Sequence, residues 1–178
     1  NAAMKIRKCT PADIETLVRI SLETFVDALE KDNDPEDFKA YTDIAFAQST
    51  LTLQLNDPHS SFYFLYMDEH LVGYFKLNEY DAQTELKSDE TMELERIYVL
   101  KHFQVRQLGA FMVKEAIRIV SDLEKKELWL GVWQENGEAI RFYEKHGFVK
   151  FDTHPYYIGK DKQTDWLMRI AIKKPLQN

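Results

Sequence analysis

The chain has 178 residues, of which 44% are hydrophobic and 30% charged, and this balance predicts one soluble globular domain. A net charge of −7 argues against general nucleic-acid binding, because phosphate contacts need clustered Lys and Arg side chains. Cys9 is the only cysteine, which excludes an internal disulfide and a Cys-rich zinc site and fits a cytoplasmic location. No apolar run approaches the ~20 residues of a membrane span, so no membrane partner is expected.

No repeat or Gly/Ser/Pro-rich linker divides the chain, so we expect a single domain over residues 4–174. Residues 1–3 precede Met4, and we interpret them as the remnant of a cloning tag. In the first half, Thr10-Pro11 and Asp34-Pro35 have the residue types that begin helices. Aromatic and aliphatic runs then predict two strands with a tight turn between them. The expected elements are a strand over 4–8, helices from about 11, 34 and 50, and strands over 61–67 and 71–77.

The second half of the chain alternates strands with helices. Residues 78–91 are polar and acidic and are expected to form a loop or extended strand ends. A strand over 93–99 precedes a long helix, whose apolar residues recur on one face up to Leu123. A strand over 127–133, a helix over 138–145 and further strands after Gly147 complete the prediction. This order is typical of a mixed α/β domain.

Two segments in this half are candidates for chemistry. In the first, the strand over 93–99 leads through 104–110 into the long helix, whose unpaired N–H groups can hold a pyrophosphate. The second comprises 128–133, Asn136 as a natural N-cap, and 139–148. Taken alone, each is weak evidence: many strand–loop–helix turns bind nothing, and Phe142 and Tyr143 are also suited to ordinary packing.

Together the two segments resemble, in order and spacing, the acetyl-CoA-binding core of the GNAT superfamily of N-acetyltransferases. Residues 93–110 resemble that family's strand and Q/R-x-x-G-x-G/A loop, and residues 136–148 its Asn-x-x-Ala-x-x-Phe-Tyr…Gly-Phe signature. Segments 20–25, 81–83, 130–133 and 163–165 resemble the bacterial PaiA-type spermidine/spermine acetyltransferases. The resemblance implies the α/β (α+β) GNAT fold, a twisted, mixed, mostly antiparallel sheet with helices on both faces. Acetyl-CoA would lie in a V-shaped splay between two parallel strands.

One residue of the loop departs from the family pattern. Gln107 stands where the family usually has its first glycine, which serves for backbone freedom or for close approach to phosphate. If Gln107 is helical, its N–H is retained and little is lost. If a positive φ is required there, cofactor affinity should fall. Because Gln104 and Gly109 are retained, we expect acetyl-CoA binding to survive.

Amine acetylation requires a neutral nitrogen. An alkyl amine with a pKa of ~10.4 is neutral in only about one molecule in 2,500 at pH 7, so a base or a desolvating site must help. Glu93 and Glu95 share one face of their predicted strand. Glu93 aligns with a glutamate base of some family members, and we expect it to act through a water while Glu95 helps to hold the ammonium group. The alternative is that both only solvate a strand end.

Tyr143 aligns with the family's usual general acid and can give its phenolic hydrogen to the leaving thiolate. The amine is expected to attack directly in a ternary complex, so no nucleophilic residue is needed. The resemblance implies that main-chain groups of 97–99 bond the pantetheine arm, that the loop holds the pyrophosphate, and that Asn136 supports the cofactor or caps its helix. The implied cofactor-binding residues are Ile97, Tyr98, Val99, Gln104, Val105, Arg106, Gln107, Leu108, Gly109, Ala110, Asn136 and Tyr143.

Acidic residues gather over 27–37 and over 79–95, and two acidic patches would suit a polyamine, although they also fit solvated loops. Another amine (of an amino acid, an aminoglycoside or a protein) and a catalytically quiet acyl-CoA-binding regulator remain as alternatives. The histidines show no paired metal-ligand spacing, so no metal is expected. Family analogy makes a homodimer plausible. The substrate-binding candidates are Glu23, Tyr80, Glu93, Glu95, Trp133 and Asp165.

Overall fold

The computed structural model of the chain describes residues 3–173, except for the side chains of Val105 and Arg106. Cofactor contacts predicted for those two side chains therefore lie outside the described residues. The strands are β1 (Met4–Lys8), β2 (Ser60–Met67), β3 (His70–Glu79), β4 (Thr91–Val99), β5 (Glu127–Trp133), β6 (Val149–Ile158) and β7 (Asp161–Ala171). The helices are α1 (Ile14–Leu29), α2 (Pro35–Ala45), α3 (Gln48–Asn56), α4 (Leu108–Asp122) and α5 (Gly137–Lys145), with short 3₁₀ turns η1 (Pro11–Asp13), η2 (Glu30–Asp32), η3 (Tyr80–Ala82) and η4 (Lys101–Arg106).

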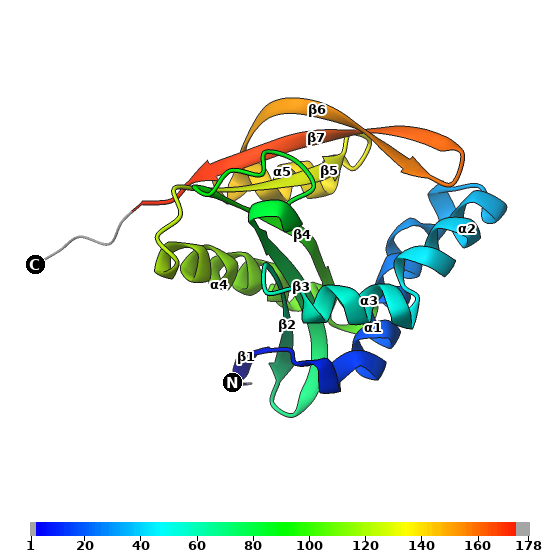
Figure 1. The fold of residues 1–178 in the computed structure, drawn as a ribbon, viewed down its shortest axis with the longest axis horizontal. Helices are drawn as coiled ribbons and strands as arrows, with labels where there is room; N and C mark the ends of the chain where they lie inside the picture. The colour runs from blue at the N-terminus through cyan, green and yellow to red at the C-terminus, as the bar shows by residue number, and fades with distance from the viewer. Residues whose placement is uncertain (1–2, 174–178) are drawn as a thin grey trace, which may run out of the picture.

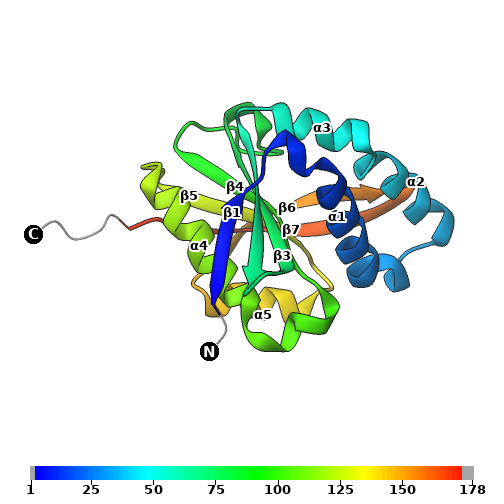
Figure 2. The ribbon, with the colours of Figure 1, turned by 90° about the horizontal axis from the view of Figure 1, so that it is seen from below.

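Within residues 3–173 the strands form one seven-stranded sheet in the order β1-β2-β3-β4-β5-β7-β6. Neighbouring strands are antiparallel except for β4 and β5, which are parallel and are connected through α4. Helices α1, α2 and α3 cover one face of the sheet, and α4 and α5 cover the other (Figures 1 and 2). This arrangement confirms the predicted mixed, mostly antiparallel sheet with helices on both faces.

Each face of the sheet has its own hydrophobic core, because side chains alternate along the strands. On β2, Phe62 and Phe64 pack with α1–α3, whereas Leu65 belongs to the core under α4. On β4 and β5, Leu94 and Leu130 face the α4 core. The intervening residues of β4 and β5 therefore face the α1–α3 side, and this alternation decides which side chains reach the site.

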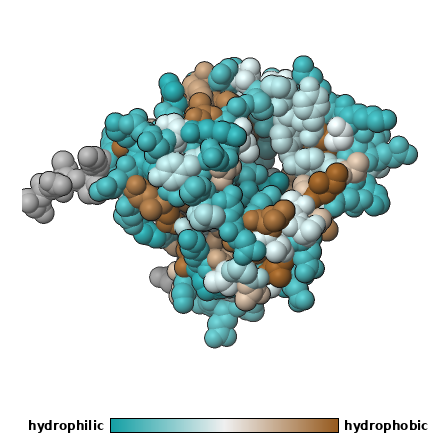
Figure 3. All heavy atoms as spheres, viewed as in Figure 1, coloured by the Kyte–Doolittle hydropathy of each residue, from teal (hydrophilic) through white to brown (hydrophobic). Residues whose placement is uncertain are grey.

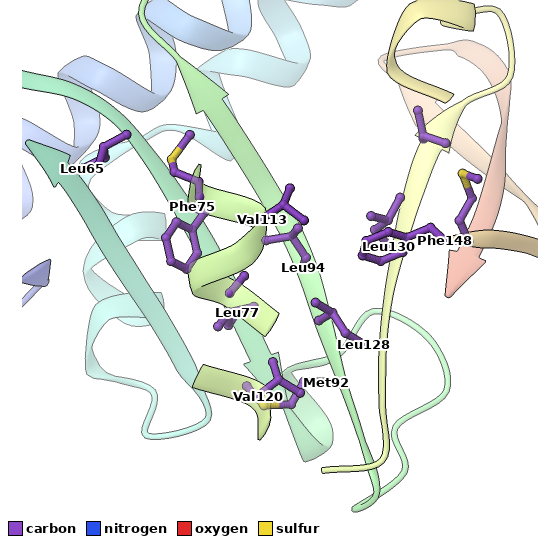
Figure 4. Packing of buried hydrophobic residues seen from close by; sticks show 14 of the residues in the cluster. Leu65, Phe75, Leu77, Met92, Leu94, Val113, Val120, Leu128, Leu130 and Phe148 are labelled. Carbon is purple, nitrogen blue, oxygen red and sulfur yellow. The ribbon is translucent and has the colours of Figure 1, made fainter. Parts of the chain in front are cut away.

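The parallel strands β4 and β5 pair over only three residues. Thr91–Glu93 lie beside Glu127–Trp129, and beyond this point the strands separate. Figure 4 shows them close together near Met92 and Leu128 and apart at Leu94 and Leu130. Beside this point, Glu95 is an extra residue in β4, since Lys76 pairs with Arg96 and Leu77 with Leu94. A bulge of this kind bends its strand, and it lies at the start of the predicted V-shaped splay.

The first helices reach across to the β6–β7 hairpin. The hydroxyls of Tyr41 and Tyr156 are 2.7 Å apart, and Gln163 Nε2 donates to Asn33 Oδ1 at 2.7 Å. Figure 1 shows α2 beside the turn between β6 and β7, and Figure 3 shows a hollow between this helical arm and the rest of the molecule. The splay is therefore bordered on the α1–α3 side by an arm that is bonded to the hairpin.

The element boundaries differ from the prediction mainly after β3. Residues 78–91 were expected to form a loop or extended strand ends, and β3 does continue through Asn78 to Glu79. Asn78 is fully buried there, and its side chain is hydrogen-bonded to Ser60 and to Glu93. A polar residue with internal partners can occupy a core strand, which composition alone did not indicate. Among the residues that the structure describes, no helix is both long and apolar enough to cross a membrane.

Candidate active site

The N-terminus of α4 lies directly after η4. Gln107 is the N-cap residue and its side chain makes no capping hydrogen bond. The amide of Phe111 donates to the Gln107 carbonyl at 3.3 Å, so the amides of residues 108–110 precede the first bond of the helix. These N–H groups and the positive end of the helix dipole fit a pyrophosphate.

Gln107 adopts φ 56° and ψ 26°, which is the left-handed region. This resolves the alternative that the sequence left open, because the loop requires a positive φ at the position where the family usually has glycine. A residue with a Cβ pays about 1 kcal/mol or more in this region. The lower cofactor affinity expected for this case stays a prediction.

The edge of β4 offers main-chain groups to the splay. The Leu100 amide donates to the Val72 carbonyl at 2.8 Å, and hydrogen-bonded pairs alternate along an antiparallel ladder. The main-chain groups of Tyr98 therefore face β3, whereas those of Ile97 and Val99 face the side from which β5 has diverged. The Gln104 side chain donates to the Val99 carbonyl at 3.2 Å. Of the three residues predicted to bond the pantetheine arm, Ile97 and Val99 have the required main-chain orientation.

Tyr143 is held on the α4 side of the splay by α5. Asn136 Oδ1 caps this helix by accepting from the Ala139 amide at 3.1 Å. The Tyr143 ring packs against Phe142 and Phe148, with centroid distances of 5.3 and 5.7 Å. Burial, with a smaller contribution from nearby Tyr98, raises the pKa of Tyr143 above its usual range. The phenol therefore stays protonated at neutral pH, as a proton donor must.

Glu93 is the last residue of β4 that pairs with β5, and the residue is 3% exposed. Its Oε1 accepts from Asn78 Nδ2 at 3.0 Å and from the Thr84 amide at 2.8 Å, and its Oε2 accepts from Thr84 Oγ1 at 2.7 Å. Burial and the neighbouring Glu95 raise the pKa of Glu93. The protein thus satisfies both oxygens of Glu93, and its predicted role as a base acting through a water stays a prediction.

Glu95 lies at the bulge of β4. Its Oε1 accepts from Lys76 Nζ at 2.7 Å and from Asn78 Nδ2 at 2.8 Å, and Arg96 Nε is 3.7 Å from Oε2. Burial alone would raise the pKa of Glu95, but the charges of Lys76 and Arg96 lower it. Asn78 bonds both Glu93 and Glu95, which confirms that the two carboxylates share a face of the strand.

Trp133 and Asp165 form a second wall of the splay. They stand opposite each other on β5 and β7. Asp165 Oδ2 is 3.3 Å from the position that a Cβ on Gly131 would occupy, so the carboxylate lies over this glycine. Burial raises the pKa of Asp165 to about 6, and the charge of His154 opposes this effect. The structure thus brings together two of the six predicted substrate residues on the β5 side of the splay, across from Glu93 and Glu95 on the β4 side.

The remaining two substrate candidates lie elsewhere. Glu23 is exposed on α1, and within residues 3–173 its carboxylate takes part in no hydrogen bond or ion pair. The Tyr80 ring lies under Lys125 Nζ at 4.1 Å and beside His59. Tyr80 follows Glu79, which pairs with Met92 at the closed end of the splay. Within residues 3–173, neither side chain is bonded to Glu95 or Asp165, and their substrate-binding roles stay predictions.

Lys76, Asn78 and Arg96 are the site residues that the sequence analysis did not identify. Lys76 and Asn78 alternate with Phe75 and Leu77 along β3, and this polar alternation within an apolar strand was the available signal. Arg96 is stacked over the Phe46 ring, 4.6 Å from its centroid. Its partners come from α1, from the end of α2 and from β3, and no local pattern indicates them.

The comparisons with known proteins agree with this geometry. The sequence profile of the acetyltransferase (GNAT) family matches residues 19–148. A protein of Lactobacillus delbrueckii subsp. lactis that is named as an N-acetyltransferase is 38% identical over 169 residues, which is 95% of this chain and 98% of its own length. The chain belongs to the GNAT family of acetyltransferases. As a GNAT enzyme it transfers an acetyl group from acetyl-CoA to an amine.

Two further likenesses are more distant. A spermidine N(1)-acetyltransferase of Thermoplasma acidophilum is 23% identical over 155 residues, which is 85% of this chain and 91% of that protein. The crystal structure of a PaiA N-acetyltransferase from the same organism, in complex with coenzyme A, has a TM-score of 0.76 at 20% identity and covers 95% of this chain and 99% of that one. The crystal structure shows that this GNAT chain shares its fold with the PaiA protein. Within residues 3–173 no group of three or more His, Cys, Asp or Glu is arranged to hold a metal ion.

Proposed function

We propose that the acceptor is a small cationic amine, with a polyamine such as spermidine or spermine as the leading candidate. The observation that carries this proposal is the position of two carboxylates. Glu95 lies on β4 and Asp165 lies beside β5, so they border the splay from its two strands, and both are on the α1–α3 face of the sheet. Several ammonium groups on one substrate need several carboxylates, and opposite charges attract in a partly desolvated cleft. The distant likeness to a protein named as a spermidine acetyltransferase supports the same substrate class.

The roles of the site residues follow from their placement. Main-chain amides at the start of α4 hold the pyrophosphate, and Ile97 and Val99 align the pantetheine arm as an added strand would. Acetyl-CoA supplies the thioester that the amine attacks. Tyr143 donates its proton to the departing sulfur, because a thiol with a pKa near ~8.5 leaves more readily when it is protonated. Glu95 is bonded to Lys76 through Oε1, so its Oε2, which is 3.7 Å from Arg96 Nε, is the oxygen that accepts from the incoming ammonium group.

A second candidate acceptor is an amine that also bears a carboxylate, such as an amino acid. It is favoured by Arg96, whose side chain is 11% exposed and lies beside Glu95. A guanidinium group suits a carboxylate ligand because its N–H donors match the two oxygens. In this case the carboxylate of the substrate would bind the Arg96 guanidinium.

Thiol release from acetyl-CoA separates these candidates. The acceptors are spermidine, spermine, lysine, butylamine as a matched monoamine, and a buffer blank. A second ammonium–carboxylate contact worth roughly 1.4 kcal/mol predicts a kcat/KM for spermidine about ten-fold above that for butylamine. Equal values for spermidine and butylamine would refute the polyamine proposal. A preference for lysine over both would support the carboxylate-bearing acceptor.

A further inference from the structure

We propose that Asp165 is the general base of this enzyme, the group that takes the proton from the attacking amine. The inference rests on the proposed transfer to a primary alkylamine and does not depend on whether that amine is a polyamine. It places the general base on β7, whereas the sequence pattern favoured Glu93 on β4 for this role. Three observations support it: the hydrogen bonds of Glu93, Glu95 and Asp165, the position of Asp165 at the opening of the splay, and the position of Tyr143 on the opposite face of the sheet.

The carboxylates differ in their hydrogen-bond partners. Glu93 accepts three hydrogen bonds with its two oxygens. Glu95 accepts two hydrogen bonds and also forms an ion pair with Arg96. Within residues 3–173, no side-chain or main-chain donor is bonded to the Asp165 carboxylate, and its side chain is only partly buried. A base must have a free lone pair within reach of the proton that it removes. Asp165 meets this requirement without breaking a bond inside the protein.

The position of Asp165 also fits the attack. Leu128, Leu130 and Val132 face the α4 core, so Gly131 faces the opposite side, where its missing side chain leaves room beside Asp165. Gly131 is exposed and lies two residues beyond Trp129, the last residue of β5 that pairs with β4. The Asp165 carboxylate is therefore at the opening of the splay. Glu95 stands in the equivalent position on the β4 side.

The proton donor and the proposed acceptor lie on opposite faces of the sheet. Tyr143 packs with the α4 core, whereas Asp165 lies over the exposed Gly131 on the α1–α3 face. Tyr98 on β4 helps to raise the pKa of Tyr143, and Asp165 helps to raise the pKa of Tyr98, so Tyr98 lies within electrostatic range of both groups. An amine that enters from the α1–α3 face then attacks the thioester while the sulfur departs toward Tyr143.

Several titratable groups face Asp165. His154 stands opposite it on β6 and is paired with Glu85 from the loop after η3, and Tyr98 of β4 lies within electrostatic range of it. Burial raises the pKa of Asp165 and the His154 charge lowers it, with a net value of about 6. A carboxyl group of this pKa is mostly ionised at pH 7, and it is a stronger base than an aspartate of ordinary pKa, ~3.9.

The protons balance as follows. The ammonium form of the amine carries three protons on nitrogen and the amide product carries one. Asp165 accepts the first, which passes to solvent, and the nitrogen lone pair then forms the C–N bond. As the C–S bond breaks, the sulfur takes the phenolic proton of Tyr143, and the second nitrogen proton restores the phenol. The products are the N-acetyl amine, free thiol and one proton released.

The pH dependence of kcat/KM for one alkylamine, measured from pH 5 to 9, tests this assignment. In the wild type the rate should fall below about pH 6 as Asp165 becomes protonated. Asp165→Asn should lower kcat/KM at pH 7 by at least ~100-fold, the size of a general-base contribution. Its remaining rate should rise about ten-fold per pH unit up to the amine pKa, because only free amine then reacts. Asp165→Glu should restore part of the rate and the acid limb.

Matched variants separate catalysis from charge and folding. Asp152→Asn removes an exposed carboxylate on β6 and should leave the profile unchanged. Glu93→Gln should retain the acid limb, and acetyl-CoA affinity, measured by calorimetry, should be unaltered in Asp165→Asn. Loss of the limb in Glu93→Gln together with its retention in Asp165→Asn would overturn the inference, as would a less than ten-fold loss in Asp165→Asn. Equal rates with butylamine and spermidine would refute the polyamine proposal but not the assignment of Asp165, because the acid limb of the pH profile can be measured with either amine.

Discussion

The two sides of the splay are built in different ways. On the cofactor side, the groups that we propose to contact the phosphate and the pantetheine arm are main-chain amides and carbonyls from residues 97–110, a single stretch of chain. On the acceptor side, the groups are side chains from β3, β4 and β7, separated by as much as 89 positions from Lys76 to Asp165. One side is contiguous in sequence and the other is assembled by the fold.

This difference explains why the family is easier to identify than the substrate. Main-chain contacts place few demands on side-chain identity, so we expect acetyl-CoA binding to survive with Gln107 in place of glycine, although with lower affinity. The proposed acceptor side depends on the charge of a few buried residues, so we expect changes there to alter which amine binds. The predictions below test whether the two sides respond as differently as their construction implies.

The largest expected effect is on the acceptor side, from Lys76→Met. Lys76 is 3% exposed and is bonded to Glu95 Oε1 at 2.7 Å. Removing one member of a buried ion pair leaves an uncompensated charge, so we expect the free energy of unfolding to fall by about 3–5 kcal/mol. Urea denaturation measures this change. The double variant Lys76→Met/Glu95→Gln should recover much of the loss.

An exposed ion pair provides the control. Lys126 Nζ lies 2.9 Å from Glu90 Oε1, and their side chains are 73% and 57% exposed. Lys126→Met should cost less than about 1 kcal/mol. A similar cost for Lys76→Met, or no recovery in the double variant, would show that the buried pair does not organise the acceptor side.

The next effect concerns Tyr143, which lies on the opposite side of the splay from Asp165. Tyr143→Phe keeps the packing against Phe142 and Phe148 but removes the proton donor. Turnover should fall about 100-fold, while the Kd for acetyl-CoA should change less than about two-fold. Single-turnover thiol release and calorimetry measure the two quantities. Equal turnover in the variant would remove Tyr143 from the mechanism.

The smallest effect is on the cofactor side, where the contacts are from the main chain. Gln107 has φ 56°, so Gln107→Gly should relieve strain and raise the free energy of unfolding by about 0.5–1 kcal/mol. Because the strained residue begins α4, the variant should also bind acetyl-CoA at least as tightly as the wild type. Thermal unfolding and calorimetry test both statements.

Glu124 is a matched control for this substitution, since it also has a positive φ, of 60°, but lies beyond the other end of α4. Glu124→Gly should stabilise the protein by a similar amount without changing acetyl-CoA affinity. Weaker acetyl-CoA binding in Gln107→Gly would mean that the Gln107 side chain itself holds the cofactor.

The sequence by itself determined the family, the sheet-and-helix order, and the positions of Asn136 and Tyr143, because these depend on local capping, periodicity and a contiguous motif. The left-handed backbone at Gln107, the bulge at Glu95, and the extension of β3 through Asn78 were decided by the tertiary structure. Glu93 and Asp165 show the physical reason. Both are carboxylates in predicted strands. Glu93 is satisfied by donors from β3 and Thr84, whereas Asp165 lies over Gly131 and accepts no hydrogen bond from residues 3–173. Their environments come from strands far apart in the chain, so only the assembled sheet distinguishes them.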